Sequence, residues 1–258
     1  YFGAKTFYSC KVADDENGAF YLNDLSEAKV EYHNTNGSSA GKTGKCLVMI
    51  TPDAERTMNT FLGISETLST NEIDETALKD SQYAYIEGYL VTSETGLPAA
   101  IELRELAETH GVKTALSLSD PAIVEYFHDG LNKMIGNGVD LLFCNEQEAL
   151  NFTKATNIDE AVSALKSIAK TFAITQGKNG ALLFDGENTI SVDAHPVKAI
   201  DTNGAGDMFA GAFLYGLTNG RSFEESGKLA SKAASVVVSQ FGPRLAAQQH
   251  AEIKESLN

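Results

Sequence analysis

Basic residues, cysteines and long apolar runs are all scarce in this sequence. Only 20 of the 258 residues are lysine or arginine, against 35 aspartates and glutamates, and the formal net charge is −15. A negative field of this size repels nucleic acid and anionic membranes, so we expect neither as a partner. An anionic nucleotide remains compatible with it, because a helix N-terminus and a bound Mg²⁺ reverse the sign locally.

The scarcity of cysteine points away from a disulfide framework. Cys10, Cys46 and Cys144 are odd in number and form no CxxC pair, so we interpret each as a reduced, buried thiol. No apolar run approaches the roughly 20 residues that a membrane span requires. The chain opens with polar and aromatic residues, not with the basic and then apolar pattern of a signal peptide. We therefore expect a cytoplasmic protein.

The sequence does contain a regular alternation of strand-like and helix-like segments from about residue 83 onward. Apolar runs typical of strands lie at 83–86, 112–118, 139–144, 172–175 and 181–184, and helical patterns at 97–109, 159–169, 205–217 and 223–239. Such alternation, with nearly uniform apolar strands, is typical of a parallel sheet covered on both faces by helices. The sequence thus predicts an α/β fold.

The segment from about 17 to 65 has a different pattern. Alternating stretches at 29–32 and 46–50 are separated by a turn rich in Gly, Ser, Asn and Thr at 34–44. This pattern predicts a β-hairpin or small sheet. We interpret the segment as a lid or a subunit-contact appendage and not as an independent domain.

A stretch inside that turn imitates a phosphate-binding P-loop. Residues 37–43 read Gly-Ser-Ser-Ala-Gly-Lys-Thr, with three residues between the glycines. A P-loop needs four, and it opens a helix. Since residues 46–51 read as a strand, a flexible hairpin tip explains this stretch better.

The sharpest chemical signal is the run Asp-Thr-Asn-Gly-Ala-Gly-Asp at 201–207, followed by the compact helical segment 208–214. Small residues allow the backbone amides at the helix start to converge, and the helix dipole then favours an anion there. A carboxylate at that point repels phosphate, unless Asp207 accepts a proton from a substrate hydroxyl while the amides hold a phosphoryl group. A glycine-rich turn with an ordinary first-turn acidic residue is the alternative, and the chemistry alone leaves both open.

The run at 201–207 resembles the DTxGAGD signature of the ribokinase-like, or PfkB, carbohydrate and nucleoside kinases. Two upstream segments match further family motifs in the expected order: 145–148 is similar to NxxE, and 175–180 is similar to TxGxxG. Residues 51–57 resemble the segment that leads from the lid back to the core. The resemblance implies a three-layer ribokinase-like α/β fold, with a mostly parallel central sheet and a small β lid, in one kinase domain over 1–258.

The resemblance also implies roles for individual residues. Asp207 is the expected general base, facing the substrate, and the amides of Gly204, Ala205 and Gly206 are expected to stabilise the γ-phosphoryl group. Glu148 is expected to hold Mg²⁺ through water, which suits a cation that dehydrates reluctantly. ATP is the implied cofactor, and the residues expected to bind it are Asn145, Thr175, Gly177, Lys178, Gly180, Gly206 and Ser231.

Several of these roles have simpler alternatives. Glu148 can be a solvated first-turn carboxylate stabilised by the helix dipole, the 175–180 loop can be a plain turn, and Ser231 can be an exposed helix serine. Asp201 is a candidate ligand of a monovalent cation such as K⁺. Arg56 either reaches substrate from the lid side or pairs with a neighbouring carboxylate on the surface.

The sequence departs from the family pattern in one respect. It shows neither the initial strand with its substrate-binding aspartate nor the Gly-Gly-rich motif followed by asparagine. We therefore expect a kinase domain that is incomplete at its N-terminus by two or more βα units, with an exposed sheet edge.

Two functions remain in competition. The first is an ATP-dependent phosphotransferase acting on a hydroxyl of a sugar or nucleoside, of the adenosine or ribose kind. The alternative is a non-catalytic nucleotide-binding relative. A dinucleotide-binding oxidoreductase requires a GxGxxG turn between strand and helix, which the sequence lacks in that context. The lid segment makes a homodimer a further expectation.

Overall fold

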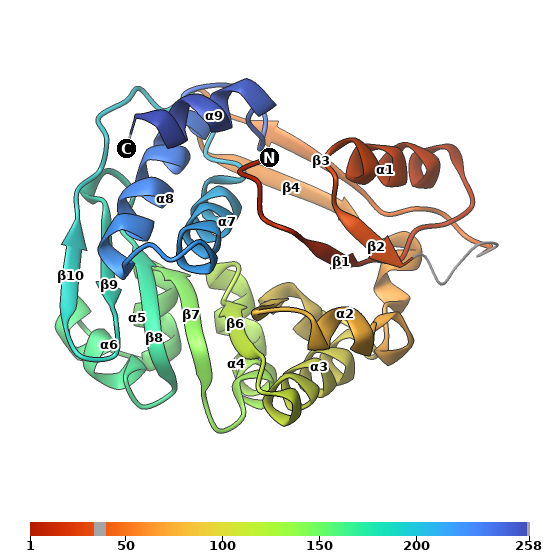
Figure 1. Cartoon of the computed structure of the whole chain (residues 1–258), viewed down its shortest axis with the longest axis horizontal. Coiled ribbons are helices and arrows are strands. Elements are labelled where there is room, and N and C mark those ends of the chain that lie inside the picture. The colour runs from red at the N-terminus through yellow and green to blue at the C-terminus, as the bar shows by residue number, and fades with distance from the viewer. Residues whose placement is uncertain (34–39, 257–258) are drawn as a thin grey trace.

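A six-stranded sheet forms the centre of the computed structural model (Figure 1), which describes residues 1–33 and 40–256. The strand order is β10 (Thr189–Val192), β9 (Ala181–Phe184), β8 (Ala169–Thr175), β7 (Val139–Asn145), β6 (Lys113–Ser117) and β5 (Tyr83–Glu87). Strands β5 to β8 are parallel, whereas β9 and β10 are antiparallel additions. The expectation of a mostly parallel sheet is confirmed.

Helices cover both faces of the sheet, giving three layers (Figure 1). One face carries α3 (Gly96–His110), α4 (Pro121–Ile135), α5 (Glu146–Thr153) and α6 (Ile158–Leu165), packed on a core that includes Leu116, Leu142 and Phe172. The other face carries α7 (Ala205–Thr218), α8 (Phe223–Val237) and α9 (Ala247–Glu255), whose core includes Phe143, Phe213 and Leu229. Burial of apolar side chains on both sheet faces explains why the strands are uniformly apolar.

Capping side chains fix the helix starts that follow the strands. Asp120 accepts a hydrogen bond from the N–H of Ala122 (2.8 Å) and precedes Pro121 at the first helical position, so it caps α4. The helix predicted at 159–169 ends earlier, at Leu165, because Ala169 already pairs with Val139 as the first residue of β8.

The segment 17–65 contains more than the predicted strands. It includes most of helix α1 (Glu16–Glu27), strand β2 (Glu31–His33), which pairs in parallel with β1 (Phe7–Ser9), and the antiparallel pair β3 (Lys45–Ile50) and β4 (Arg56–Phe61). We call the β3–β4 pair the lid hairpin; in Figure 1 it extends from the body of the molecule beyond α7, on the side of α1.

The turn of the lid hairpin lies at 51–55, so the prediction that 34–44 joins the two paired strands is wrong. Asp53 accepts hydrogen bonds from the hydroxyl of Thr51 (2.5 Å) and the N–H of Glu55 (3.4 Å), and Ala54 adopts a left-handed conformation with φ 67°. Residues 34–39 of the predicted turn lie outside the described part of the chain. Ala40 to Thr43 lead into strand β3 and not into a helix, as we expected of the false P-loop.

The remaining elements are short. They are α2 (Glu75–Lys79), and the 3₁₀ helices η1 (Gly63–Thr67), η2 (Thr70–Glu72), η3 (Gly88–Thr92) and η4 (Gly177–Asn179). Cys10 and Cys144 are buried thiols, but Cys46 on β3 is exposed, which corrects our expectation for that residue. No helix in the described ranges combines the length and the apolar character needed to cross a bilayer.

Candidate active site

The carboxyl ends of the parallel strands bring two of the predicted motifs together. Asn145 ends β7 and Thr175 ends β8, and the two residues are direct partners in the parallel register. On the next pair of strands, Glu87 at the end of β5 is the register partner of Ser117 at the end of β6. Ligands of open α/β sheets bind outside this edge, so the register places the NxxE and TxGxxG segments where a ligand is expected.

Asn145 and Glu148 form a reciprocal capping box at the start of α5. The Asn145 side chain accepts from the N–H of Glu148 (2.8 Å), and Glu148 accepts from the backbone N–H (2.9 Å) and the side-chain amide (2.6 Å) of Asn145. Glu148 is only 5% exposed, so the alternative of a solvated first-turn carboxylate is wrong. Burial raises the pKa of Glu148 to about 7.

The TxGxxG segment forms the loop between β8 and β9. Gly180 has φ 90°, and a Cβ on it would lie 2.0 Å from the carbonyl oxygen of Val192, so only glycine fits. The side-chain amide of Gln176 donates to Glu146 on α5 (2.9 Å), which ties this loop to the NxxE helix. Gly177 and Lys178 lie on the exposed side of the loop.

The signature run ends in the first turn of α7. Gly204 has φ 76° and precedes the helix, and a Cβ on it would lie 2.4 Å from the carbonyl oxygen of Pro243. The N–H of Ala205 donates to the carbonyl of Thr202 (3.3 Å), whereas the N–H groups of Gly206 and Asp207 find no acceptor among the described residues. Free first-turn amides, combined with the helix dipole, attract an anion.

Asp201 organises the loop before the helix. Its carboxylate is 3% exposed and accepts from the N–H of Asn203 (2.8 Å) and the N–H of Gly242 (2.9 Å). The two bonds fix the 201–204 loop against the segment after α8. Each carboxylate oxygen keeps a further lone pair, so the predicted role toward a monovalent cation stays a prediction.

Thr202 anchors the lid hairpin beside α7. Its hydroxyl and its N–H both donate to the carbonyl of Ala54, at 3.0 and 3.3 Å. This anchor holds the first residue of β4, Arg56, close enough to Asp207 for the two charges to interact. Burial raises the pKa of Asp207 and the positive charge of Arg56 opposes that rise.

Two more carboxylates, Glu87 and Asp120, join Glu148 and Asp207 in what we call the carboxylate cluster; Asp120 is a strand-end candidate of the sequence as well as a helix cap, whereas Glu87 was not singled out there. Glu87 accepts from the hydroxyl of Ser119 (3.0 Å), and burial raises its pKa, with the charge of Asp207 adding to the rise. The charge of Asp120 in turn acts on Glu148. The position of Glu87 at the end of an apolar strand is the signal that identifies it.

Glu148, with Asp120 near it, suits Mg²⁺ held largely through water. Oxygen ligands are those that Mg²⁺ prefers, and it keeps several waters when bound to protein. No group of three His, Cys, Asp or Glu side chains in the described ranges is arranged to hold a metal directly. A buried carboxyl with a raised pKa, such as Glu148, is nevertheless suited to a nearby cation, because the cation favours its ionised form.

Ser231 lies apart from the carboxylate cluster. It is 8% exposed on α8, and its hydroxyl donates to the carbonyl of Asp193 just after β10 (2.9 Å). The alternative of an exposed helix serine is therefore wrong. Its role toward the nucleotide stays a prediction.

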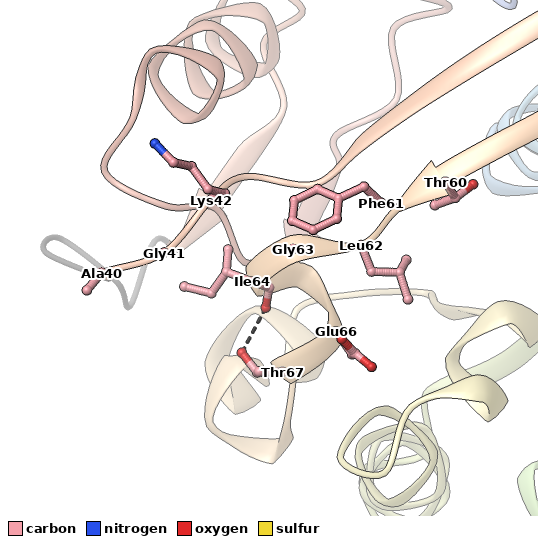
Figure 2. Close-up of a pocket in the computed structure, with 10 residues that line it drawn as sticks. All are labelled: Ala40, Gly41, Lys42, Thr60, Phe61, Leu62, Gly63, Ile64, Glu66 and Thr67. Atoms are coloured by element: carbon pink, nitrogen blue, oxygen red, sulfur yellow. Dashed lines mark hydrogen bonds between the residues drawn. The ribbon is translucent and has the colours of Figure 1, made fainter.

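A cavity of about 630 Å³ lies at the end of the lid hairpin opposite its turn. Figure 2 shows its lining, from Ala40, Gly41 and Lys42 across to the segment 60–64, with Glu66 and Thr67 below. It contains none of the predicted site residues. The candidate active site is therefore at the strand-end carboxylates and not in this cavity.

Comparison of the chain with known proteins shows the family to which it belongs. The model of the pfkB family carbohydrate kinases matches residues 1–250. An adenosine kinase of Schizophyllum commune is 32% identical over 227 residues, covering 79% of this chain and 64% of that protein. A ribokinase of Staphylococcus aureus (strain COL) is 29% identical over 248 residues, covering 93% and 78%.

A solved structure agrees with these relatives. The adenosine kinase from Sinorhizobium meliloti superposes with a TM-score of 0.94 at 32% identity, covering 99% of this chain and 79% of that one. The chain thus spans less than two thirds of the length of the Schizophyllum relative and about four fifths of the solved structure. With the family model matching nearly all of its residues, the chain belongs to the pfkB family of carbohydrate kinases.

Proposed function

We propose that this chain is an ATP-dependent phosphotransferase that phosphorylates a hydroxyl of a sugar or nucleoside. The observation that carries the proposal is the start of α7, where two unpaired amides adjoin the Asp207 carboxyl and Arg56 acts on that carboxyl from the lid side. A phosphoryl group held at such amides lies next to a base that can accept the proton of the attacking hydroxyl.

Asp207 is the proposed general base, and it also contacts the acceptor. A general base works best when its pKa lies near the operating pH, and burial moves the pKa of Asp207 upward from its ordinary value. The N–H groups of Gly206 and Asp207 are the main donors to the transferring phosphoryl group. Gly204 and Ala205 contribute by setting the helix start, and Arg56 balances charge from the lid.

The nucleotide is proposed to lie along the edge formed by β7, β8 and the loop to β9. The residues proposed for it are Asn145, Thr175, Gly177, Lys178, Gly180 and Ser231. Glu148 is the proposed residue for Mg²⁺, which supplies neutralisation of phosphate charge when bound. Asp201 is the proposed residue for K⁺.

The acceptor is proposed to be a nucleoside of the adenosine kind, with ribose as the second candidate. Arg56, Met58 and Thr60 share one face of the lid hairpin with their register partners Ile50, Val48 and Cys46. Because Arg56 acts on the carboxylate cluster, this face is the one turned toward the acceptor. The apolar pair Val48 and Met58 in the middle of the face suits a nucleobase. The adenosine kinase relatives support the same choice.

The outer face of the lid hairpin exposes Leu47, Met49 and Phe61. Contiguous exposed apolar side chains are typical of an interaction site, so we propose a homodimer through this face, in a cytoplasmic protein. Sedimentation velocity of the chain and of its Leu47→Glu variant tests this; a monomer at every concentration contradicts the dimer.

The test of the activity is ATP turnover with a panel of acceptors. ADP formation is measured with Mg²⁺ present, with adenosine, other nucleosides, ribose and other sugars supplied in turn, and with an acceptor-free control. The proposal expects acceptor-dependent ADP formation, highest with adenosine. ATP binding by calorimetry without turnover on any acceptor supports the non-catalytic alternative instead.

A further inference from the structure

Ser119 adopts a backbone conformation that is unusual for its residue type and its place in the chain. It has φ 71°, in the left-handed region, and only three other non-glycine residues in the described ranges share a positive φ: Lys29, Ala54 and Lys154. Lys29 and Lys154 follow helix ends and Ala54 lies in the hairpin turn, where such conformations are common. Ser119 instead lies between the end of β6 and the start of α4.

The turn at Ser119 is closed by several hydrogen bonds. The N–H of Asp120 donates to the carbonyl of Leu118 (2.9 Å), which makes Ser119 the central residue of a γ-turn, and the positive φ corresponds to its strained form. The N–H of Ser119 donates to the Ser117 hydroxyl (3.1 Å). A Cβ on the neighbouring Gly88 would lie 3.0 Å from the Ser119 hydroxyl, so the turn is seated directly on the end of β5.

The turn aims the Ser119 hydroxyl at one carboxylate. Its Oγ donates to Glu87 Oε2 at 3.0 Å, and the nearby Tyr85 side chain opposes the rise in the pKa of Glu87. Asp207 repels Glu87 from α7, Glu148 adds negative charge from α5, and the hydroxyl of Tyr8 on β1 is within electrostatic reach of Glu87. Without a fixed donor, this repulsion would favour rotation of the Glu87 side chain away from Asp207.

We propose that Ser119 is a positioning residue, whose strained turn holds the Glu87 carboxylate beside Asp207 so that Glu87 accepts a hydrogen bond from the acceptor molecule. The catalytic consequence of this inference rests on the proposed function. The positioning of Glu87 by Ser119 is independent of it. Strain of this kind persists where the surrounding structure fixes it, and it is concentrated at functional sites. The hydroxyl also stabilises the ionised form of Glu87, because it donates to the carboxylate.

The test compares Ser119→Gly with Lys154→Gly. Both glycines relieve a positive φ, but only Ser119→Gly removes a donor to Glu87; Lys154 ends α5 away from the carboxylate cluster. The titration of Glu87 is followed by ¹³C NMR of the glutamate carboxyls, assigned with Glu87→Gln. We expect the pKa of Glu87 to rise in Ser119→Gly and to stay unchanged in Lys154→Gly. Ser119→Ala removes the same hydroxyl and repeats the test if the glycine variant does not fold.

Kinetics give the second readout. Loss of a hydrogen bond to a charged group is expected to lower kcat/KM for the acceptor about tenfold, with KM for ATP unchanged. The effect is expected to vanish in the Glu87→Ala background, where no side-chain oxygen remains to accept from Ser119.

The outcomes separate the two proposals. An unchanged Glu87 titration in Ser119→Gly overturns the positioning role, whatever the chain phosphorylates. A changed titration in a chain that turns over no acceptor keeps the positioning role and overturns the proposed function. A kinetic loss that persists in full in the Glu87→Ala background also counts against the inference.

Discussion

Replacing Gly204 by alanine removes the backbone conformation on which α7 begins. Gly204 has φ 76°, and a left-handed conformation costs a residue with a Cβ about 1–2 kcal/mol. The new Cβ would also lie 2.4 Å from the carbonyl oxygen of Pro243 and 2.7 Å from its Cβ, both far below contact distance. Forcing an atom into a packed site costs about 1–3 kcal/mol.

The two contributions together predict a loss of about 3 kcal/mol in the free energy of unfolding. For a chain of this size, that corresponds to a fall in Tm of about 6–12 °C. Gly206→Ala is the matched control, because its Cβ would meet no atom within 4 Å. That substitution is expected to stabilise the helix by about 0.5–1 kcal/mol, while weakening ATP binding by placing a methyl group where the phosphoryl group is proposed to lie.

The assay is urea unfolding followed by circular dichroism, with calorimetric ATP titration of each folded variant. The reasoning is refuted if Gly204→Ala is as stable as the unsubstituted chain. It is equally refuted if Gly206→Ala loses as much stability as Gly204→Ala, because the cost then has nothing to do with φ or with Pro243.

Three further predictions follow from particular contacts. The pKa of Glu148 is about 7 in the fold, against an ordinary value of 4.5. Between these two pH values the metal-free fold keeps the proton that the unfolded chain has lost. The stability contributed by this proton is therefore lost as pH rises from about 4.5 through 7. Glu148→Gln can keep the capping box with Asn145 and should lose less stability than the parent between pH 5 and pH 8 in urea unfolding; parallel pH profiles would contradict the buried carboxyl. Ser226→Ala removes a buried hydroxyl that has no hydrogen-bond partner among the described residues and should raise the free energy of unfolding by about 1 kcal/mol, measured in the same way; a loss of stability would show that the hydroxyl is satisfied. Thr202→Val removes the hydroxyl donor to Ala54 and should speed trypsin cleavage at Arg56, because it loosens the turn of the lid hairpin. An unchanged cleavage rate would show that the backbone bond alone suffices.

The sequence predicted the central sheet and the start of α7 because local signals decide them. Uniform apolar runs identify buried strands. Once two such strands pair in parallel, their register alone brings Asn145 and Thr175 together. The signature run also predicts the backbone just before α7. The residue there must adopt a left-handed conformation, and Gly204 does so without a steric cost.

The lid segment was predicted less well because its pairing depends on a turn with weak signals. Ala54 takes a left-handed conformation, for which alanine gives no warning, and Asp53 closes the turn through its side chain. Glu87 was missed for a different reason. Its strand-end position marks Glu87 as a candidate, but the approach of Asp207 on a much later helix and the unusual turn at Ser119 set its role, and neither contact is visible in local sequence.

The most direct measurement of the central claim is single-turnover phosphoryl transfer by Asp207→Asn, with ATP affinity measured in parallel. Loss of a general base is expected to slow transfer by about 10²–10⁴-fold, while ATP binds as tightly as before or more tightly, because a negative charge beside the phosphoryl site has been removed. Transfer at the unsubstituted rate, or loss of ATP binding together with transfer, would contradict the assignment of Asp207 as the base beside the α7 amides.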